Sequence, residues 1–284
     1  MNFSIAISVL LLATIMHSIW NVYAKRASNG FVFVWFIGTV TTILYAPFVI
    51  AVLCTTSFSF NLYQIGLLLL SGFLHFAYTL FLLYCYEKVD MTVAYPIIRG
   101  MVPVLAGCAG LLFLNENIGN VGLCGVVAII TGVWLVGSTS DNKYTLEPIL
   151  WGLGTAFFAA AYSLCDKIAV TDGGINPIVL DYAGAVMRCV ILMPFVFRKP
   201  KTVSKAWKEH RTSIFVVGIL MPLSFILVLY ALKTLPLTVV VPIRELSVLW
   251  GIVIAGALLG EKKILIRLKY ALLIPIGVIL IIMG

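Results

Sequence analysis

Three arginines lie inside apolar stretches of this chain, and their surroundings point to chemistry. Arg99 closes the segment Thr92-Val-Ala-Tyr-Pro-Ile-Ile-Arg99, and Arg244 closes the similar segment Thr238-Val-Val-Val-Pro-Ile-Arg244. Arg188 lies in a third apolar stretch, seven residues after Asp181. An arginine at the centre of a bilayer costs about 2.5–3.5 kcal/mol on insertion scales. Each of the three therefore needs a charged partner, water or a bound ligand.

A proline precedes the arginine in both similar segments. Proline inside a helix removes one backbone hydrogen bond and frees a carbonyl. Pro96 and Pro242 are 146 residues apart, and Arg99 and Arg244 are 145 apart, so the segments belong to two copies of one unit. We predict a binding site where broken helices of the two copies meet. The alternatives are kinked helices whose arginines reach toward lipid headgroups, or a network of charges that only holds the helices together.

Glu245 follows Arg244 directly, and we expect it to be the one acid deep inside a span. It could neutralise an arginine, recognise a substrate amine or carry a coupling proton; a structural ion pair is the alternative. His17 and His75 lie in the first and third apolar stretches and could titrate near neutral pH. For both histidines the alternative is a hydrogen-bonded packing role.

Aromatic side chains could form the walls of such a site. Trp20 and Tyr162 stand at equivalent positions of two similar segments 142 residues apart, and Asn21 and Ser163 follow them. Aromatic rings attract cationic groups through their quadrupole, although aromatics are also enriched at both membrane interfaces. The candidate substrate-binding residues are Arg99, Arg244, Glu245, Arg188, Trp20, Tyr162, Asn21, Tyr95, Tyr78, Tyr230, His75 and His17.

The composition indicates an integral membrane protein, with the lipid bilayer as its surroundings. The chain is 62% hydrophobic and 11% charged, whereas soluble domains are about 45–50% apolar and about 25% charged. The net charge of +8 does not indicate nucleic acid, because the basic residues lie mainly in short loops between apolar runs. The six cysteines are scattered singly, which favours packing roles over disulfides or a metal site. Nothing in the sequence calls for a cofactor.

Ten apolar runs are long enough to cross a ~30 Å hydrocarbon core. They cover residues 3–23, 31–53, 61–85, 91–114, 118–138, 148–168, 177–197, 212–232, 237–259 and 266–283. The repeat is five runs long, and an odd number of crossings makes the second copy enter the membrane from the opposite side. The predicted fold is an all-α membrane protein with ten transmembrane helices in two inverted five-helix repeats, residues 1–140 and 147–284.

The distribution of basic residues orients these spans. Of the 19 lysines and arginines, 14 fall in odd-numbered loops and 2 in even-numbered loops. Because cytoplasmic loops carry the excess of positive charge, the odd loops are expected in the cytoplasm and both termini on the outer face of the cytoplasmic (inner) membrane. The basic segment 198–211 contributes most to this bias and is expected to be a loop.

The proline segments and the pairs that close their apolar runs resemble the EamA-type transporters of the drug/metabolite transporter superfamily. The resemblance rests on Pro96, Pro103 and Asn115-Glu116 in the first half, and on 241–248 and Leu259-Gly-Glu261 in the second. It implies ten spans in two inverted halves and a transport activity. Members include exporters of amino acids and other metabolites, choline-type importers and nucleotide-sugar exchangers. Asn115 stands where glycine is common in the family.

Taken together, these features predict a secondary transporter that moves a small polar metabolite by alternating access. Three arginines against two acids within spans favour a substrate with an anionic group: an amino acid, a phosphorylated or phosphonate compound, or a zwitterion. No GxxxxGK[ST] loop is present, so the energy would come from a coupling proton, a counter-substrate or the substrate gradient. A lipid flippase and a non-transporting scaffold are the alternatives, and an enzyme is not expected. The protein would act as a monomer or homodimer.

Overall fold

A computed structural model describes residues 3–27, 30–55, 60–88, 91–115, 118–139, 146–259 and 264–284. These residues form helices and contain no strand. The first half contains α1 (Phe3–Arg26), α2 (Gly30–Thr55), α3 (Leu62–Lys88), α4 (Met91–Phe113) and α5 (Asn120–Ser138). The second half contains α6 (Leu146–Val170), α7 (Pro177–Phe197), α8 (Pro200–Leu232), α9 (Leu237–Arg244), α10 (Ser247–Leu259), α11 (Ile264–Ala271) and α12 (Leu273–Met283).

The apolar character of these helices fits a membrane interior. Within the described residues, seven helical stretches are long and apolar enough to cross a membrane, and shorter apolar stretches occur at Met101–Phe113 and Asn120–Gly132. Every predicted run coincides with helix, although the ninth is divided into α9 and α10, and the tenth into α11 and α12. The fold is therefore a multi-pass helical bundle.

The ninth predicted run is broken immediately after Arg244. The amide of Glu245 donates to the Pro242 carbonyl at 2.9 Å, and the amide of Leu246 donates to the Ile243 carbonyl at 3.0 Å. These three-residue spacings replace the four-residue spacing of an α-helix, so the chain tightens and α10 begins again at Ser247. The proline segment of the second copy thus ends in a helix break, as the sequence predicts.

The first copy behaves differently. A break at Pro96 was expected, and this prediction is wrong, because α4 continues through that position as one helix. Pro96 lies five residues after the start of α4 at Met91, as Pro242 lies five residues after the start of α9 at Leu237, so distance from the helix start does not distinguish the two copies. Asn115, just beyond α4, has a positive φ of 51°. Asparagine tolerates this left-handed conformation, which otherwise favours glycine.

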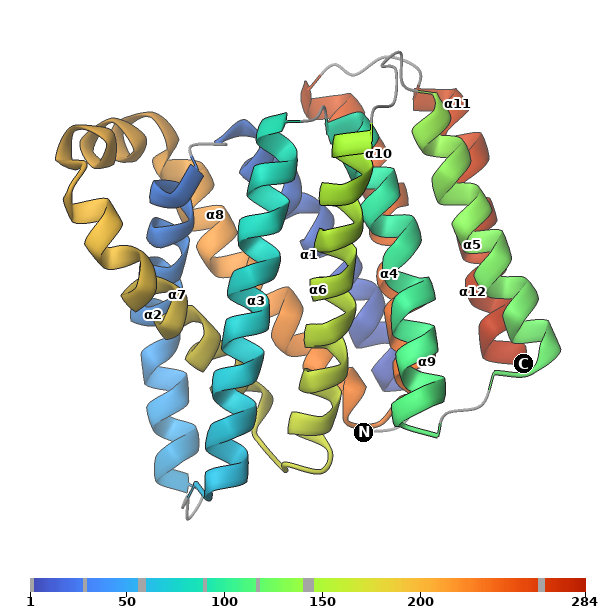
Figure 1. Ribbon diagram of the computed structural model, residues 1–284, viewed down its shortest axis with the longest axis horizontal. Coiled ribbons are helices and arrows are strands. Elements are labelled where there is room, and N and C mark those ends of the chain that lie inside the picture. The colour runs from blue at the N-terminus through green and yellow to red at the C-terminus, as the bar shows by residue number, and fades with distance from the viewer. Residues whose placement is uncertain are drawn as a thin grey trace.

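The basic segment 198–211 also differs from its prediction. It is helical from Pro200 onward, as the first part of α8, and not a loop. The helix loses its regular geometry at His210, where φ is −125° and ψ is 15°. In Figure 1 the beginning of α8 is turned away from the rest of that helix. Lysines on this first part can therefore remain at the bundle's end while the apolar remainder enters it.

The pattern of helix contacts stays the same when each helix is replaced by its counterpart in the other half. α1 packs on α8 as α6 packs on α3, and α1 packs on α10 as α6 packs on α4. α2 packs on its counterpart α7, and α5 packs on its counterpart α12. In Figure 1, α1 and α6 cross the bundle in opposite directions, and the N and C termini lie at the same end. Residues near the centre of the bundle therefore come from both halves.

The backbones of α5 and α12 approach each other closely at a pair of glycines. A Cβ atom added at Gly125 would lie 2.5 Å from the Gly277 carbonyl oxygen, and one added at Gly277 would lie 2.5 Å from the Gly125 carbonyl oxygen. Small residues let membrane helices approach closely enough for dispersion to hold them. This glycine pair joins the two halves at the contact between α5 and α12. Neither glycine lines the cavity described below.

Candidate functional site

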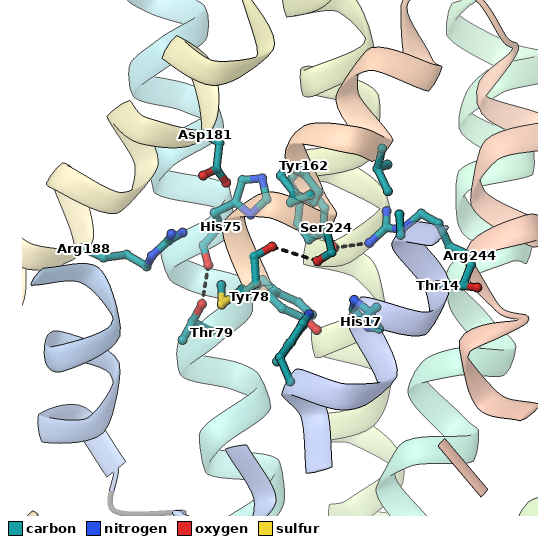
Figure 2. Close-up of a pocket in the computed structure, with 15 residues that line it drawn as sticks. Thr14, His17, His75, Tyr78, Thr79, Tyr162, Asp181, Arg188, Ser224 and Arg244 are labelled. Carbon is teal, nitrogen blue, oxygen red and sulfur yellow. Dashed lines mark hydrogen bonds between the residues drawn. The ribbon is translucent and has the colours of Figure 1, made fainter. Parts of the chain in front are cut away.

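A cavity with charged and polar side chains in its lining lies between helices of the two halves (Figure 2). Its empty space is about 630 Å³, including space open to solvent. The described side chains that line it come from α1, α3, α6, α7, α8 and α9. They are Ala13, Thr14, His17, Trp20, His75, Tyr78, Thr79, Tyr162, Asp181, Arg188, Met221, Ser224, Phe225, Val228 and Arg244.

Equivalent positions of α3 and α8 face this cavity. His75, Tyr78 and Thr79 on α3 stand 146 residues before Met221, Ser224 and Phe225 on α8, and all six line it. This is the spacing that separates the two prolines of the repeated segments. Equivalent positions of the two halves therefore line one cavity, and its chemical asymmetry arises because these positions carry different side chains.

Arg244 enters the cavity from the last position of α9, directly before the helix break. Its guanidinium donates to the Tyr162 hydroxyl at 3.2 Å and, at the long distance of 3.5 Å, to the Ser163 hydroxyl. The Arg244 Cζ also lies 5.8 Å from the centre of the Phe225 ring, within the range of a cation–π interaction. Protein groups thus hold this arginine in place.

Arg188 enters from the opposite side of the cavity in the view of Figure 2. It lies in the middle of α7 and is only 5% exposed. Among the side chains that the structure describes, no hydrogen bond or ion pair reaches its guanidinium. Asp181 on the same helix lines the same cavity, and the two charges interact electrostatically. Seven residues of helix separate them by about 10 Å along the axis.

Aromatic rings form the wall between these two arginines. The His75 ring stacks on the Tyr162 ring, with 4.0 Å between centroids and 23° between planes. Phe225 meets the edge of His75 at 4.9 Å, and Tyr78 meets Tyr162 edge-on at 5.3 Å. The ring stack fixes the position of the Tyr162 hydroxyl, which in turn accepts a hydrogen bond from Arg244.

A buried carboxylate lies directly behind this wall. Asp166 is 0% exposed, and its two oxygens meet the Ser71 hydroxyl at 2.5 Å and the His75 Nε2 at 2.9 Å. Both partners come from α3, four residues apart on one helix face, whereas Asp166 belongs to α6. The network therefore joins α3 to α6 and connects a buried acid to a histidine of the cavity.

Comparison with known proteins identifies the family. The profile of the EamA-like transporter family matches residues 4–138 and again residues 146–283. The chain belongs to the EamA-like transporter family. No curated protein matches it. A protein of known crystal structure is similar over 98% of both chains, with a TM-score of 0.74 and 12% sequence identity. At that identity the likeness shows the shared fold alone.

Family membership gives the general activity. EamA-like proteins are membrane transporters of the drug/metabolite type and not enzymes, and the double match agrees with the two halves seen in the packing. The chain is accordingly a multi-pass membrane protein. Neither finding specifies the substrate.

The cavity of this EamA-like transporter brings together seven of the predicted binding residues. These are Arg188, Arg244, Trp20, Tyr162, Tyr78, His75 and His17. Three others are described but do not line it: Glu245, Asn21 and Tyr230. Glu245 is buried beside the helix break, and the Asn21 amide donates to the His17 carbonyl at 2.8 Å. The side chains of Arg99 and Tyr95 lie outside the described part of the structure.

Asp166 is the residue that the sequence analysis missed. The expectation that Glu245 is the one deep acid is wrong, because Asp166 is at least as buried. The sixth span was predicted to end at residue 168, which placed Asp166 near a boundary, but α6 continues to Val170. Two spacings could have signalled the network: Tyr162 and Asp166 are four residues apart, as are Ser71 and His75. Only the packing of α3 on α6 shows that these two faces meet.

Proposed function

We propose that this protein is a secondary transporter for a small polar metabolite that carries an anionic group. The observation that carries the proposal is the pair of arginines in one cavity. Arg188 and Arg244 face a single lining carboxylate, Asp181, among the described side chains, so the lining has a formal charge of +1. A charge of this sign near the centre of a membrane protein is costly unless an anion accompanies it. Amino acids, phosphorylated or phosphonate compounds and other zwitterions fit this requirement.

We infer that transport occurs by alternating access across the cytoplasmic membrane. Ten crossings in two inverted repeats, residues 1–140 and 147–284, would place the cavity between two halves that can rock against each other. The opposite directions of α1 and α6, and a packing scheme preserved on exchange of the halves, support the inversion. The excess of basic residues in odd loops places both termini on the outer face. The transporter would work as a monomer or homodimer, with a coupling proton or a counter-substrate.

A thermal-shift experiment tests the anion requirement. Detergent-solubilised protein is heated with L-glutamate, taurine or phosphoserine, and with choline as a cationic control compound. A compound that binds only the folded protein raises its melting temperature. We expect at least one anionic or zwitterionic compound to raise it by several degrees, and choline to leave it unchanged.

A matched variant distinguishes anion binding in the cavity from an effect of the protein's overall positive charge. R188Q removes a guanidinium from the cavity, whereas R267Q removes one that donates to Thr139, outside the cavity. The anion-induced shift should disappear in R188Q and persist in R267Q. Stabilisation by choline alone, or equal anion-induced shifts in R188Q and R267Q, would contradict the proposal.

A further inference from the structure

A fully buried carboxylate inside a membrane protein needs compensation. Among the described side chains, Asp166 receives a hydrogen bond from Ser71 and contacts one ionisable partner, His75. Breaking up such a pair leaves an uncompensated charge, which is strongly unfavourable in a low-dielectric interior. The carboxylate and the imidazole therefore act as one unit, which can hold one proton or none.

His75 connects this unit to the cavity. Its side chain is 14% exposed and belongs to the cavity lining, whereas Asp166 is completely covered. When Asp166 is ionised, the His75 Nε2 must carry a hydrogen to bond with it. The other ring nitrogen, Nδ1, is then the base that can accept a proton. Histidine is the side chain whose charge ordinarily changes between pH 5 and pH 8.

Other polar groups face the unit from the neighbouring helices. α7 contributes Asp181 and Arg188, and α1 contributes His17 across the cavity. α8 contributes the Phe225 ring and no charged side chain to the lining. Lys167 follows Asp166 on α6, but its ammonium donates to the Leu232 and Leu235 carbonyls at 2.6 and 2.9 Å. On α4, the side chains of 91–97, 99 and 100 lie outside the described part.

We propose that the His75–Asp166 pair is the site of a coupling proton that travels with the anionic substrate. This inference rests on the proposed transport function. The proton enters from cavity water to His75, remains while the substrate is bound, and returns to water when the substrate leaves on the other side. One proton and one anion thus move together.

The charge of the lining explains why proton and anion bind together. Without the proton, the pair has a charge of −1 and cancels the +1 of Arg188, Arg244 and Asp181. With the proton, the pair is neutral and the site keeps its +1. An anion therefore binds more tightly to the protonated site, and by linkage its binding favours protonation equally.

A contact route joins the proton to the anion site. The imidazole that would receive the proton stacks on Tyr162, and the Tyr162 hydroxyl accepts a hydrogen bond from Arg244. A change of charge at His75 is therefore felt at Arg244 through one intervening side chain. Coupling between two ligands commonly amounts to about 5- to 150-fold in affinity, and we expect a value in this range.

Two variants should give opposite, flat pH profiles. D166N removes the negative charge of the pair at every pH, so anion affinity at pH 8 should match that of the wild type at pH 6. H75Q offers Asp166 an amide N–H in place of the ring Nε2 but provides no base, so the carboxylate keeps its charge and affinity should be low at both pH values. Loss of a merely structural link between α3 and α6 would weaken binding in both variants alike. H210Q, at the bend of α8 away from the cavity, should keep the wild-type profile.

Calorimetry of the wild type provides a measurement that needs no variant. Whichever of L-glutamate, taurine and phosphoserine stabilises the protein most is titrated in two buffers that differ in ionisation enthalpy. The difference gives the protons taken up per anion, after subtraction of any proton that the probe itself exchanges. We expect about one proton near neutral pH, and none in H75Q.

The outcomes separate this inference from the function on which it rests. Anion binding without proton uptake in the wild type, or undiminished uptake in H75Q, would overturn the proton site and leave the anion transporter standing. If none of the three compounds binds, the proposed function fails, and the proton site fails with it.

Discussion

The cavity presents two arginines in contrasting surroundings. Arg244 is held by the hydroxyls of Tyr162 and Ser163 and lies over the ring of Phe225. Arg188 is 5% exposed, and no described side chain donates to it, accepts from it or pairs with it within ion-pair distance. The two arginines therefore differ in what they can contribute to binding. The Arg244 guanidinium already donates hydrogen bonds to the protein, whereas the N–H groups of Arg188 can donate to a ligand.

Replacing Arg188 and replacing Arg244 should change the stability of the protein in different ways. A buried cation without a hydrogen-bonded partner destabilises the protein that contains it. Its replacement by a neutral side chain should therefore not lower the melting temperature. Arg244 makes hydrogen bonds that typically contribute about 1 kcal/mol each, so its replacement should lower the melting temperature. Each arginine can thus be examined by binding and by stability together.

The largest effect is expected from R188Q. Hydrogen bonds to charged groups contribute about 1.5–3 kcal/mol, so the loss of Arg188 should weaken anion binding by about 100-fold. The melting temperature without ligand should stay the same or rise. Equilibrium titration with the stabilising anion, followed by thermal melting, measures both quantities. R188K should recover only part of the affinity, because an ammonium cannot make the bidentate contact of a guanidinium. A fall in stability without a loss of affinity would reverse the roles assigned to the two arginines.

R244Q should have a smaller effect on binding, about tenfold, because part of the guanidinium is already committed to Tyr162 and Ser163. Unlike R188Q, it should also lower the melting temperature. The same titration and melting experiments apply. Equal losses of affinity in R244Q and R188Q would remove the contrast between the two ends of the cavity.

D181N should act in the opposite direction. Removal of the carboxylate that interacts with Arg188 raises the positive potential of the site, so a purely anionic probe should bind about fivefold more tightly. A zwitterion whose amine lies near Asp181 should instead bind more weakly. Comparison of phosphate with taurine in D181N therefore reports which end of a zwitterion lies at α7. No change for either probe would show that Asp181 is too far from the bound ligand to matter.

Y162F should have the smallest effect. It removes one hydroxyl that accepts from Arg244 while keeping the ring that stacks on His75. We expect about a twofold loss of affinity, because the guanidinium keeps its charge but loses one restraint. Titration beside R244Q in the same buffer checks this order. A loss as large as that of R244Q would show that the hydroxyl itself contacts the substrate.

The sequence predicts the helical runs well, because their signal is local. Continuous apolar stretches and the spacing of Pro96 and Pro242 predict helices and a duplication without any knowledge of contacts. The helix break after Arg244 was also within reach, since proline removes a hydrogen bond at a known place. The unbroken α4 was not, because Pro96 and Pro242 each lie five residues after the start of their helix and only the helix of Pro242 ends soon afterwards.

The site was only partly predictable, for a different reason. Arg188 stands out because a charge among apolar residues is costly wherever its neighbours are. Asp166 does not stand out, because its meaning depends on Ser71 and His75, almost one hundred residues earlier in the chain. Glu245 and Tyr230 were chosen from their sequence neighbourhood alone, and neither lines the cavity. Local chemistry identifies charged candidates, and tertiary packing decides which of them meet.

A structure of the protein bound to the anion that stabilises it most tests the central claim directly. We expect the anionic group to lie in the cavity between α7 and α9, with its oxygens within hydrogen-bond distance of the Arg188 guanidinium. The stacked rings of His75 and Tyr162 should remain beside it. An anion held only at the bundle's ends, or Arg188 paired with a protein carboxylate while the cavity holds only water, would contradict the account.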